Sequence, residues 1–113
     1  MLSKKQRIGR KEFMEIISRG RRYNSTHLTL YLLKEANAGN SVFSFSASKK
    51  VSKKATSRNT LRRRGYSVIN KILKKIKPGY KCFFLFKNNS SNPNFSILEI
   101  EILELLKSGG VLS

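Results

Sequence analysis

Two neighbouring stretches of the chain alternate between apolar and polar side chains, as a β-strand with one buried face does. Residues 27 to 34 place three leucines on one side, and residues 41 to 48 place two phenylalanines and an alanine on one side. A Gly-Asn turn signal lies between the two stretches. We therefore expect a β-hairpin with one buried face and a wetter face that carries Ser44 and Ser46, with Tyr31 opposite the leucines.

Apolar residues at helical spacing predict helices on both sides of this hairpin. Residues 10 to 19 are expected to form a short helix that a glycine ends, and residues 56 to 76 a longer amphipathic helix that a Pro-Gly pair stops. Residues 80 to 87 are strongly apolar, which predicts a central strand. The last element, residues 95 to 107, begins with strand-like alternation, but a Ser-x-x-Glu capping box that starts at Ser96 and two later glycines favour a helix.

This order of elements predicts an α+β fold, a compact two-layer α/β sandwich in which three helices pack on a mixed sheet of about four strands. The length of 113 residues suits a single domain over residues 1 to 113, and 39% hydrophobic residues suffice for one core. No apolar run approaches the ~18 residues of a membrane span. The N-terminus lacks the apolar segment of a signal peptide, and one cysteine allows no internal disulfide, so we expect a cytoplasmic protein.

Charge is the strongest functional signal. The chain has 24 Lys and Arg residues against 6 acidic ones, a formal charge of +18 at pH 7. No acidic residue lies between Ala36 and Leu98, and that stretch holds fourteen basic residues, eight of them between Lys49 and Arg64. Folding brings these like charges together, and a polyanion would relieve the repulsion. Nucleic acid is the favoured partner, ahead of an anionic membrane surface.

The basic residues gather where the second predicted strand runs into the long helix. A helix N-terminus presents free N–H groups and partial positive charge, and it therefore favours phosphate. Arginine can grip phosphate oxygens at two points, and asparagine can bond to sugar or base edges. A merely solvated helix face usually carries interspersed glutamates, and this one carries none. Contact with RNA or DNA is the better interpretation.

With these features the chain resembles the protein component of bacterial ribonuclease P. That family combines a strand ending in Ser-Lys-Lys-Val, a short basic spacer and an Arg-Asn-Arg segment on a helix; here these are residues 48 to 51, 52 to 57 and 58 to 64. An early aromatic, a glycine followed by a basic pair, an apolar strand and a leucine-rich last helix also fit. Two positions depart from the pattern: Thr60 replaces the last arginine of the trio, and Ser52 replaces the usual glycine.

The resemblance implies both a fold and an activity. The fold is an α/β sandwich with a left-handed crossover around the basic helix. The activity is endonucleolytic removal of the 5′ leader from precursor tRNA, with the chemistry on a large catalytic RNA that binds Mg²⁺ and with this chain as its accessory subunit. The partners would be that RNA and the leader, without a membrane or a required protein oligomer. The chain itself would hold no catalytic residue, metal or cofactor.

The resemblance also implies two groups of binding residues. Those expected to bind the catalytic RNA lie at the start of the basic helix and just before it: Lys53, Lys54, Arg58, Asn59, Arg62, Arg63 and Arg64. Those expected to hold the leader lie on or beside the wet face of the sheet: Phe13, Tyr31, Ser46, Lys49 and Lys50. The second group has the chemistry that single-stranded RNA needs, aromatic stacking surfaces beside positive charge. From the residues alone, Phe13 is better explained as the core anchor of the first helix, and Tyr31 could equally be a core or a binding side chain.

Three other functions are weaker. One is a small ribosomal or RNA-chaperone-type protein without a role in tRNA cleavage. Another is a membrane-surface protein, but the apolar face of residues 61 to 76 is needed for the core. Catalysis by the chain itself has little support, because there is one histidine, His27, no aspartate and no zinc-ligand spacing. Cys82 is expected to be a core thiol.

Overall fold

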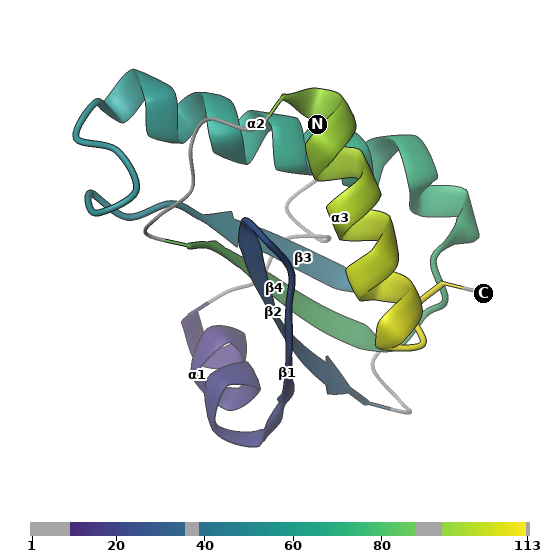
Figure 1. Cartoon of the computed structure of the whole chain (residues 1–113). Coiled ribbons are helices and arrows are strands. Elements are labelled where there is room, and N and C mark those ends of the chain that lie inside the picture. The colour runs from purple at the N-terminus through teal and green to yellow at the C-terminus, as the bar shows by residue number, and fades with distance from the viewer. Residues whose placement is uncertain (1–9, 36–38, 88–93, 113) are drawn as a thin grey trace.

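The structure, a computed structural model, describes residues 10–35, 39–87 and 94–112 (Figure 1). Three α-helices and a four-stranded sheet confirm the predicted α+β class. In chain order the elements are α1 (Arg10–Arg19), β1 (Arg21–Asn24), β2 (Leu28–Lys34), β3 (Val42–Ser46), α2 (Ala55–Ile72), the 3₁₀-helix η2 (Leu73–Lys75), β4 (Tyr80–Phe86) and α3 (Phe95–Ser108).

The sheet has the strand order β1-β2-β4-β3. β2 pairs with β4 in antiparallel fashion and β3 pairs with β4 in parallel, so the predicted hairpin of β2 with β3 is wrong. β4 lies between them because α2 carries the chain back along the sheet before β4 begins. The most apolar strand thereby takes a central position, where it is covered on both faces.

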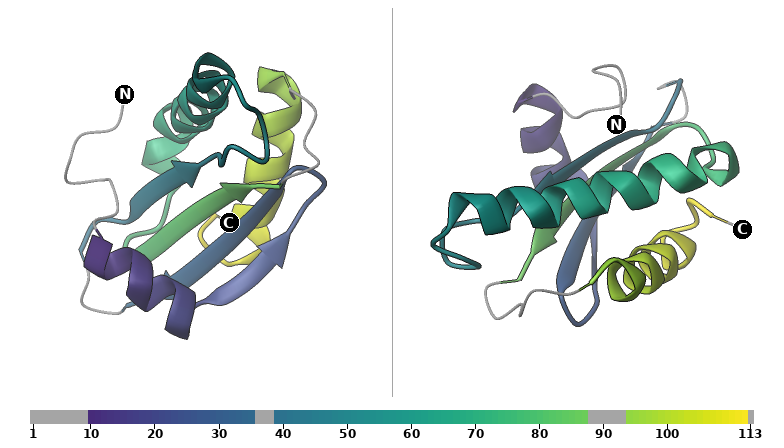
Figure 2. Two further views of the ribbon diagram at one scale, coloured as in Figure 1. Left: turned by 90° about the vertical axis from the view of Figure 1, so that its left-hand side faces the viewer. Right: turned by 90° about the horizontal axis from the view of Figure 1, so that it is seen from above.

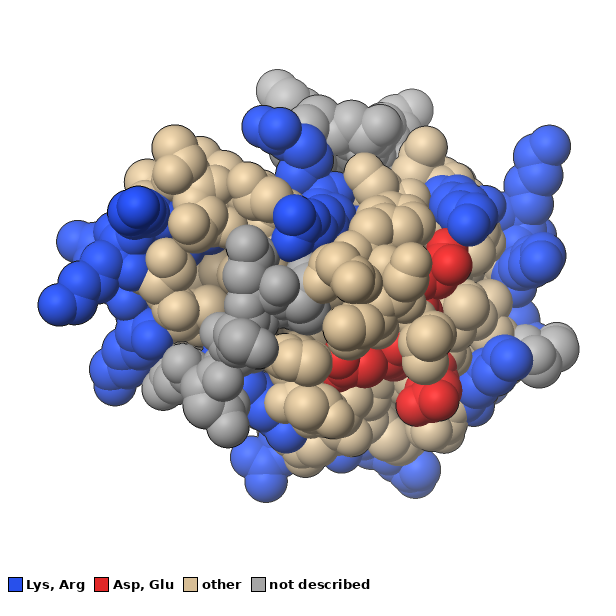
Figure 3. All heavy atoms as spheres, turned by 45° about the horizontal axis from the view of Figure 1, so that its top comes forward, with Lys and Arg blue, Asp and Glu red and all other residues tan. Residues whose placement is uncertain are grey.

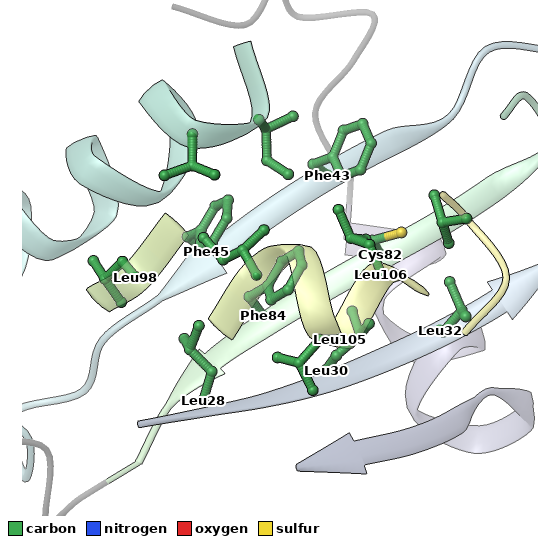
Figure 4. Packing of buried hydrophobic residues seen from close by; sticks show 14 of the residues in the cluster. Leu28, Leu30, Leu32, Phe43, Phe45, Cys82, Phe84, Leu98, Leu105 and Leu106 are labelled. Carbon is green, nitrogen blue, oxygen red and sulfur yellow. The ribbon is translucent and has the colours of Figure 1, made fainter. Parts of the chain in front are cut away.

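Helices lie on both faces of the sheet (Figure 2). α2 and α3 pack on one face and on each other, and the side chains between them and the sheet form the main core. Phe45 and Phe84 stack at its centre, with ring centroids 4.6 Å apart (Figure 4). α1 packs on the opposite face, where Ile16, Leu33 and Phe83 form a smaller cluster. The alternation of residues 27 to 34 and 41 to 48 predicts the correct side chains for the main core.

Close packing explains Gly65, which weakens the helical pattern of α2. A Cβ atom at this position would lie 2.5 Å from the ring of Phe45. The phenol oxygen of Tyr66 accepts the Phe45 N–H at 3.3 Å, and the two rings meet edge to face. The glycine therefore lets α2 approach β3 closely. The α-helix itself ends at Ile72, four residues before its predicted end.

The final helix is present, but its cap differs from the predicted one. Asn94 is the N-cap, and its side-chain oxygen accepts the backbone N–H of Ile97 at 2.9 Å. The helix therefore begins at Phe95, and the predicted capping box at Ser96 lies inside its first turn. The helix ends at Ser108, before two glycines, as the pattern indicates.

Candidate nucleic-acid interface

The sheet face on which α1 packs, here called the α1 face, carries the wet surface expected from the sequence. Strand register places its side chains in rows across the sheet. One row crosses all four strands and consists of Arg22, Tyr31, Phe83 and Ser44. The row toward the C-terminal end of β3 ends in Leu85 and Ser46. Two residues expected to hold a single strand, Tyr31 and Ser46, thus share this face.

An aromatic cluster fixes α1 to the α1 face. The ring centroid of Phe13 lies 4.7 Å from that of Phe83 in an edge-on arrangement, and the Tyr31 centroid lies 6.1 Å from it. Phe83 is buried, whereas Phe13 and Tyr31 are half-buried and keep part of their surface exposed. Phe13 therefore anchors α1 and also presents part of a ring. Phe83 was not among the predicted site residues, although the alternation of β4 places it opposite Phe84.

Two carboxylates approach Lys81 at one end of the α1 face. Its Nζ lies 3.4 Å from Glu35 Oε2 and 3.8 Å from Glu15 Oε1. A hydrogen bond with Glu35 raises the pKa of Glu15, and desolvation adds to this rise. The same bond lowers the pKa of Glu35. The described carboxylates of this face lie at the end away from Ser46, which leaves the Ser46 end electrostatically favourable to an anion.

A basic turn continues the α1 face beyond β3. Ser44 and Ser46 are small and half-buried, and the chain then turns, with the N–H of Val51 donating to the Ser48 carbonyl at 3.0 Å. The predicted cations Lys49 and Lys50 lie in this turn and are exposed. Small side chains followed by two cations suit a nucleic-acid backbone that runs along β3.

Arg58 organises the entry into α2. Its Nη1 donates to the carbonyl oxygens of Ser52 at 2.9 Å and Lys53 at 3.2 Å. The hydroxyl of Ser52 accepts the N–H of Lys54 at 3.3 Å. Arg58 thus holds the preceding segment against the first turn of the helix. Ser52, which stands where the family has glycine, supplies a hydrogen bond in that turn.

The N-terminus of α2 has no side-chain cap. Lys54 occupies the N-cap position in an extended conformation, and its side chain makes no capping hydrogen bond to the first turn, which also lacks acidic residues. The unpaired N–H groups and the helix dipole make this end partially positive. Lys53 and Lys54 are exposed beside it. All these features favour an anionic partner.

Residues three or four positions apart line the polar side of α2. Arg62 donates to the Oδ1 of Asn59, which orients both side chains. Arg63 is exposed, and Arg64 is half-buried one turn beyond Thr60. Thr60 donates its hydroxyl to the backbone carbonyl one turn earlier, at 2.9 Å. Arg64 therefore lies on the same side of the helix as Thr60, the position at which the motif lacks its third arginine.

In Figure 3, Lys and Arg side chains stand over the turn and the start of α2, at the left of the view, with no acidic side chain visible among them. The acidic side chains lie right of centre, toward α3, where further Lys and Arg side chains surround them. Lys71, farther along α2, pairs with Glu99 of α3 at 2.8 Å. For the basic side chains from Lys49 to Arg63, no described carboxylate lies within ion-pair distance. This basic end, residues 49 to 64, is therefore the part of the described chain best suited to phosphate.

The remaining chemistry-bearing residues have structural roles. His27 Nδ1 lies 2.5 Å from Glu101 Oε2, so the histidine is part of a contact between the β1–β2 turn and α3. Cys82 is a buried free thiol, and burial raises its pKa. Within residues 10–35, 39–87 and 94–112, no three metal-ligating side chains cluster. No described helix is long and apolar enough to cross a membrane.

Sequence comparisons show similarity to one protein family over nearly the whole chain. The family model described as Ribonuclease P matches residues 2–109. The ribonuclease P protein component of Microcystis aeruginosa is 33% identical over 106 residues, with 91% of this chain and 88% of that protein covered. The same component of Pseudanabaena is 30% identical, with 99% and 97% covered, and that of Clostridium botulinum is 32% identical, with 89% and 90% covered.

Solved structures share the fold. The RNase P protein of Staphylococcus aureus matches with a TM-score of 0.85 at 16% identity, covering 96% of this chain and 98% of the other. The RNase P protein of Thermotoga maritima matches with a TM-score of 0.80 at 21% identity, covering 90% and 96%. Together with the family match across residues 2–109, these similarities show that the chain belongs to the ribonuclease P protein family.

Proposed function

We propose that this chain assists a catalytic RNA in the endonucleolytic removal of the 5′ leader from precursor tRNA. Membership of the ribonuclease P protein family supports the activity. The observation that carries the proposal is the succession of binding features along the chain. The serines of the α1 face, which share that face with the aromatic cluster, are followed by the exposed Lys49–Lys50 turn and then by the uncapped start of α2.

The basic end binds the catalytic RNA. Folded RNA brings phosphates close together, and binding releases the counterions that those phosphates hold. Three consecutive arginines of α2 point in successive directions around the helix axis: Arg62, Arg63 and Arg64. Two exposed lysines, Lys53 and Lys54, lie beside the N-terminal N–H groups of the helix. Arg58 contributes by positioning, because its Nη1 is bonded to the preceding backbone. The protein recognises the shape of the phosphate backbone of the RNA and does not read its base sequence.

The α1 face holds the single-stranded leader. The exposed parts of the Phe13 and Tyr31 rings can stack on bases, and Phe83 fixes both rings from below. Ser44 and Ser46 leave room for a sugar-phosphate backbone along β3. Two lysines, Lys49 and Lys50, then meet the phosphates at the end of that path. The leader and the catalytic RNA thus bind to adjoining parts of one surface.

We place the cleavage chemistry, with its Mg²⁺, on the RNA subunit. The contribution of this chain is affinity for the substrate and neutralisation of phosphate charge, which lowers the magnesium concentration that the RNA needs. Its single histidine is held by Glu101 in the β1–β2 turn and is not among the residues assigned to either RNA. The complex acts in the cytosol and requires no protein oligomer.

Reconstitution tests this function. The chain is mixed with a catalytic RNA of the ribonuclease P type and a precursor tRNA, and the 5′ ends of the products are mapped at several magnesium concentrations. We expect cleavage at the junction of leader and mature tRNA, at less magnesium than the RNA alone requires. Unchanged cleavage and unchanged magnesium dependence would contradict the proposal, and general RNA binding without this effect would favour an RNA-chaperone role.

A further inference from the structure

A second cationic site lies at the opposite corner of the sheet from the basic end. It is a pocket of about 420 Å³ between the end of α1, β1, the end of β2, the start of β4 and the end of α3. β1 and β3 are the two edge strands, and the pocket is at the C-terminal end of β2, whereas α2 starts beyond the C-terminal end of β3. A strand such as β2 spans roughly 20 Å from one end to the other. One phosphate therefore cannot touch both the pocket and the basic end.

Three cations from three elements surround this pocket: Arg19, Arg21 and Lys34. Arg21 is exposed, and no described carboxylate lies within ion-pair distance of it. Lys34 Nζ lies 5.6 Å from the centre of the Tyr80 ring, which holds the ammonium group over the pocket. Arg19 also pairs with Glu15, and its Nη1 lies 3.4 Å from that carboxylate. Because this ion pair is exposed and therefore weak, a phosphate can readily replace the carboxylate.

The floor of the pocket offers few competing acceptors. The carbonyl oxygens at the C-terminal end of α3 would repel an anion if they were unpaired. The Gly110 carbonyl accepts the hydroxyl of Tyr80 at 3.2 Å, and the Leu105 carbonyl accepts the Gly109 N–H at 3.0 Å. The Lys107 carbonyl accepts the Gly110 N–H at 3.1 Å. The cations therefore dominate the electrostatics of the pocket.

We infer that this pocket binds a phosphate group, independently of the basic end and of the α1 face. The group is of the size that the pocket admits, and the Arg21 guanidinium can bind two of its oxygens while Lys34 supplies a point charge. The phosphate belongs either to the backbone of a bound RNA or to a free phosphate or nucleotide. The chemistry is the same in both cases, and the site adds a second anchoring point to the proposed function if the source is RNA.

Titration of the folded chain with inorganic phosphate tests the site directly. In a ¹⁵N NMR experiment we expect saturable shifts of the backbone amides of Tyr23 and Gly109, two other residues that line the pocket. The double substitution Arg21→Gln with Lys34→Gln should weaken this binding at least tenfold. The double substitution Lys74→Gln with Lys75→Gln removes two exposed cations of η2 and is the matched control, with unchanged phosphate binding.

Salt dependence of RNA binding then separates the two sources of phosphate. If the site binds RNA, the Arg21 and Lys34 double variant lowers the slope of log affinity against log salt by about one, while the Lys74 and Lys75 double variant leaves it unchanged. If the source is a free phosphate or nucleotide, phosphate binding is lost and the RNA slope is unchanged. Preference for precursor over mature tRNA persists in either case, which separates this site from the leader site.

Absence of phosphate-dependent shifts at Tyr23 and Gly109 in the unsubstituted chain would overturn the inference. Equal weakening of phosphate binding by Lys74→Gln with Lys75→Gln would also overturn it, because the effect would then reflect total charge alone. The titration of the unsubstituted chain remains decisive if the Arg21 and Lys34 double variant does not fold.

Discussion

The imidazole Nδ1 of His27 lies 2.5 Å from Oε2 of Glu101, which joins the turn between β1 and β2 to the middle of α3. The other carboxylate oxygen accepts the His27 N–H at 2.8 Å and the Ser25 hydroxyl at 2.5 Å. Glu101 is 7% exposed. One buried carboxylate therefore binds three polar groups of a turn that lies far earlier in the chain, and it positions β1 at the edge of the sheet.

Glu101→Gln should destabilise the fold by about 2 kcal/mol, because the amide cannot accept all three hydrogen bonds. Burial would raise the pKa of Glu101, but the hydrogen bonds from Ser25 and from the backbone and ring of His27 outweigh it and lower that pKa. The stabilisation is therefore present above the unfolded-state pKa and is lost as pH falls through the lower folded-state value. Urea unfolding across the acidic pH range measures both effects.

Glu104→Gln is the matched control, because Glu104 is an exposed carboxylate one turn away on the same helix. It should change stability by less than about 0.5 kcal/mol. An acid-stability profile that is the same in Glu101→Gln as in the unsubstituted chain would contradict the role assigned to this carboxylate.

Gly65→Ala should destabilise the chain by about 1–3 kcal/mol, although alanine is the better helix former. The added methyl group would lie 2.5 Å from the Phe45 ring, so α2 or β3 must shift. Thermal or urea unfolding measures the loss. Asn70→Ala, at an exposed position of the same helix, should be neutral or slightly stabilising. A stabilised Gly65→Ala variant would show that the helix has room at this point.

Replacing Arg62 and Arg63 together by alanine should weaken binding to the catalytic RNA and flatten its salt dependence by about one to two units of slope. In the proposed function, each of these two side chains, near the middle of α2, contacts one phosphate. Filter-binding at several salt concentrations gives the slope. The control is a double alanine variant at Lys74 and Lys75, the exposed cations of η2, which should keep the slope. Equal slopes in all three proteins would remove this segment from the RNA contact.

Tyr31→Ala should weaken binding of precursor tRNA by about 1–3 kcal/mol and leave binding of mature tRNA unchanged, because one base loses its stacking surface. Tyr31→Phe keeps the ring and should bind both RNAs as the unsubstituted protein does. Equilibrium binding to the reconstituted complex, with each RNA in turn, measures the difference. Equal losses on both RNAs would place Tyr31 outside the leader site.

The strands and their buried faces could be predicted because alternation is a local property. The order of the strands could not, because it depends on where α2 returns the chain. Nothing in the pattern of residues 27 to 48 indicates that Tyr80–Phe86 inserts between the two strands. β1 was also difficult to predict, since its four residues, Arg21–Asn24, include two arginines and show no apolar pattern.

Charge and motif in the sequence single out cations that the structure shows to be exposed, such as Lys49 and Arg63, and their role in RNA binding stays a prediction. Phe83 was missed because its neighbours in β4 are also apolar, and only the sheet shows which of them face α1. The partner of His27 was unpredictable for another reason, since Glu101 is 74 residues away and lies on a different element. The pocket beside Arg21 likewise depends on several elements meeting at one corner of the sheet.

The measurement that most directly tests the central claim is the affinity of the reconstituted complex for precursor tRNAs that differ only in leader length. Affinity should rise as the leader grows long enough to reach along the α1 face, and then remain constant. The increase should disappear when the protein is omitted and should shrink with Tyr31→Ala. An affinity that is independent of leader length, with the protein bound and active, would contradict the assignment of the α1 face to the leader.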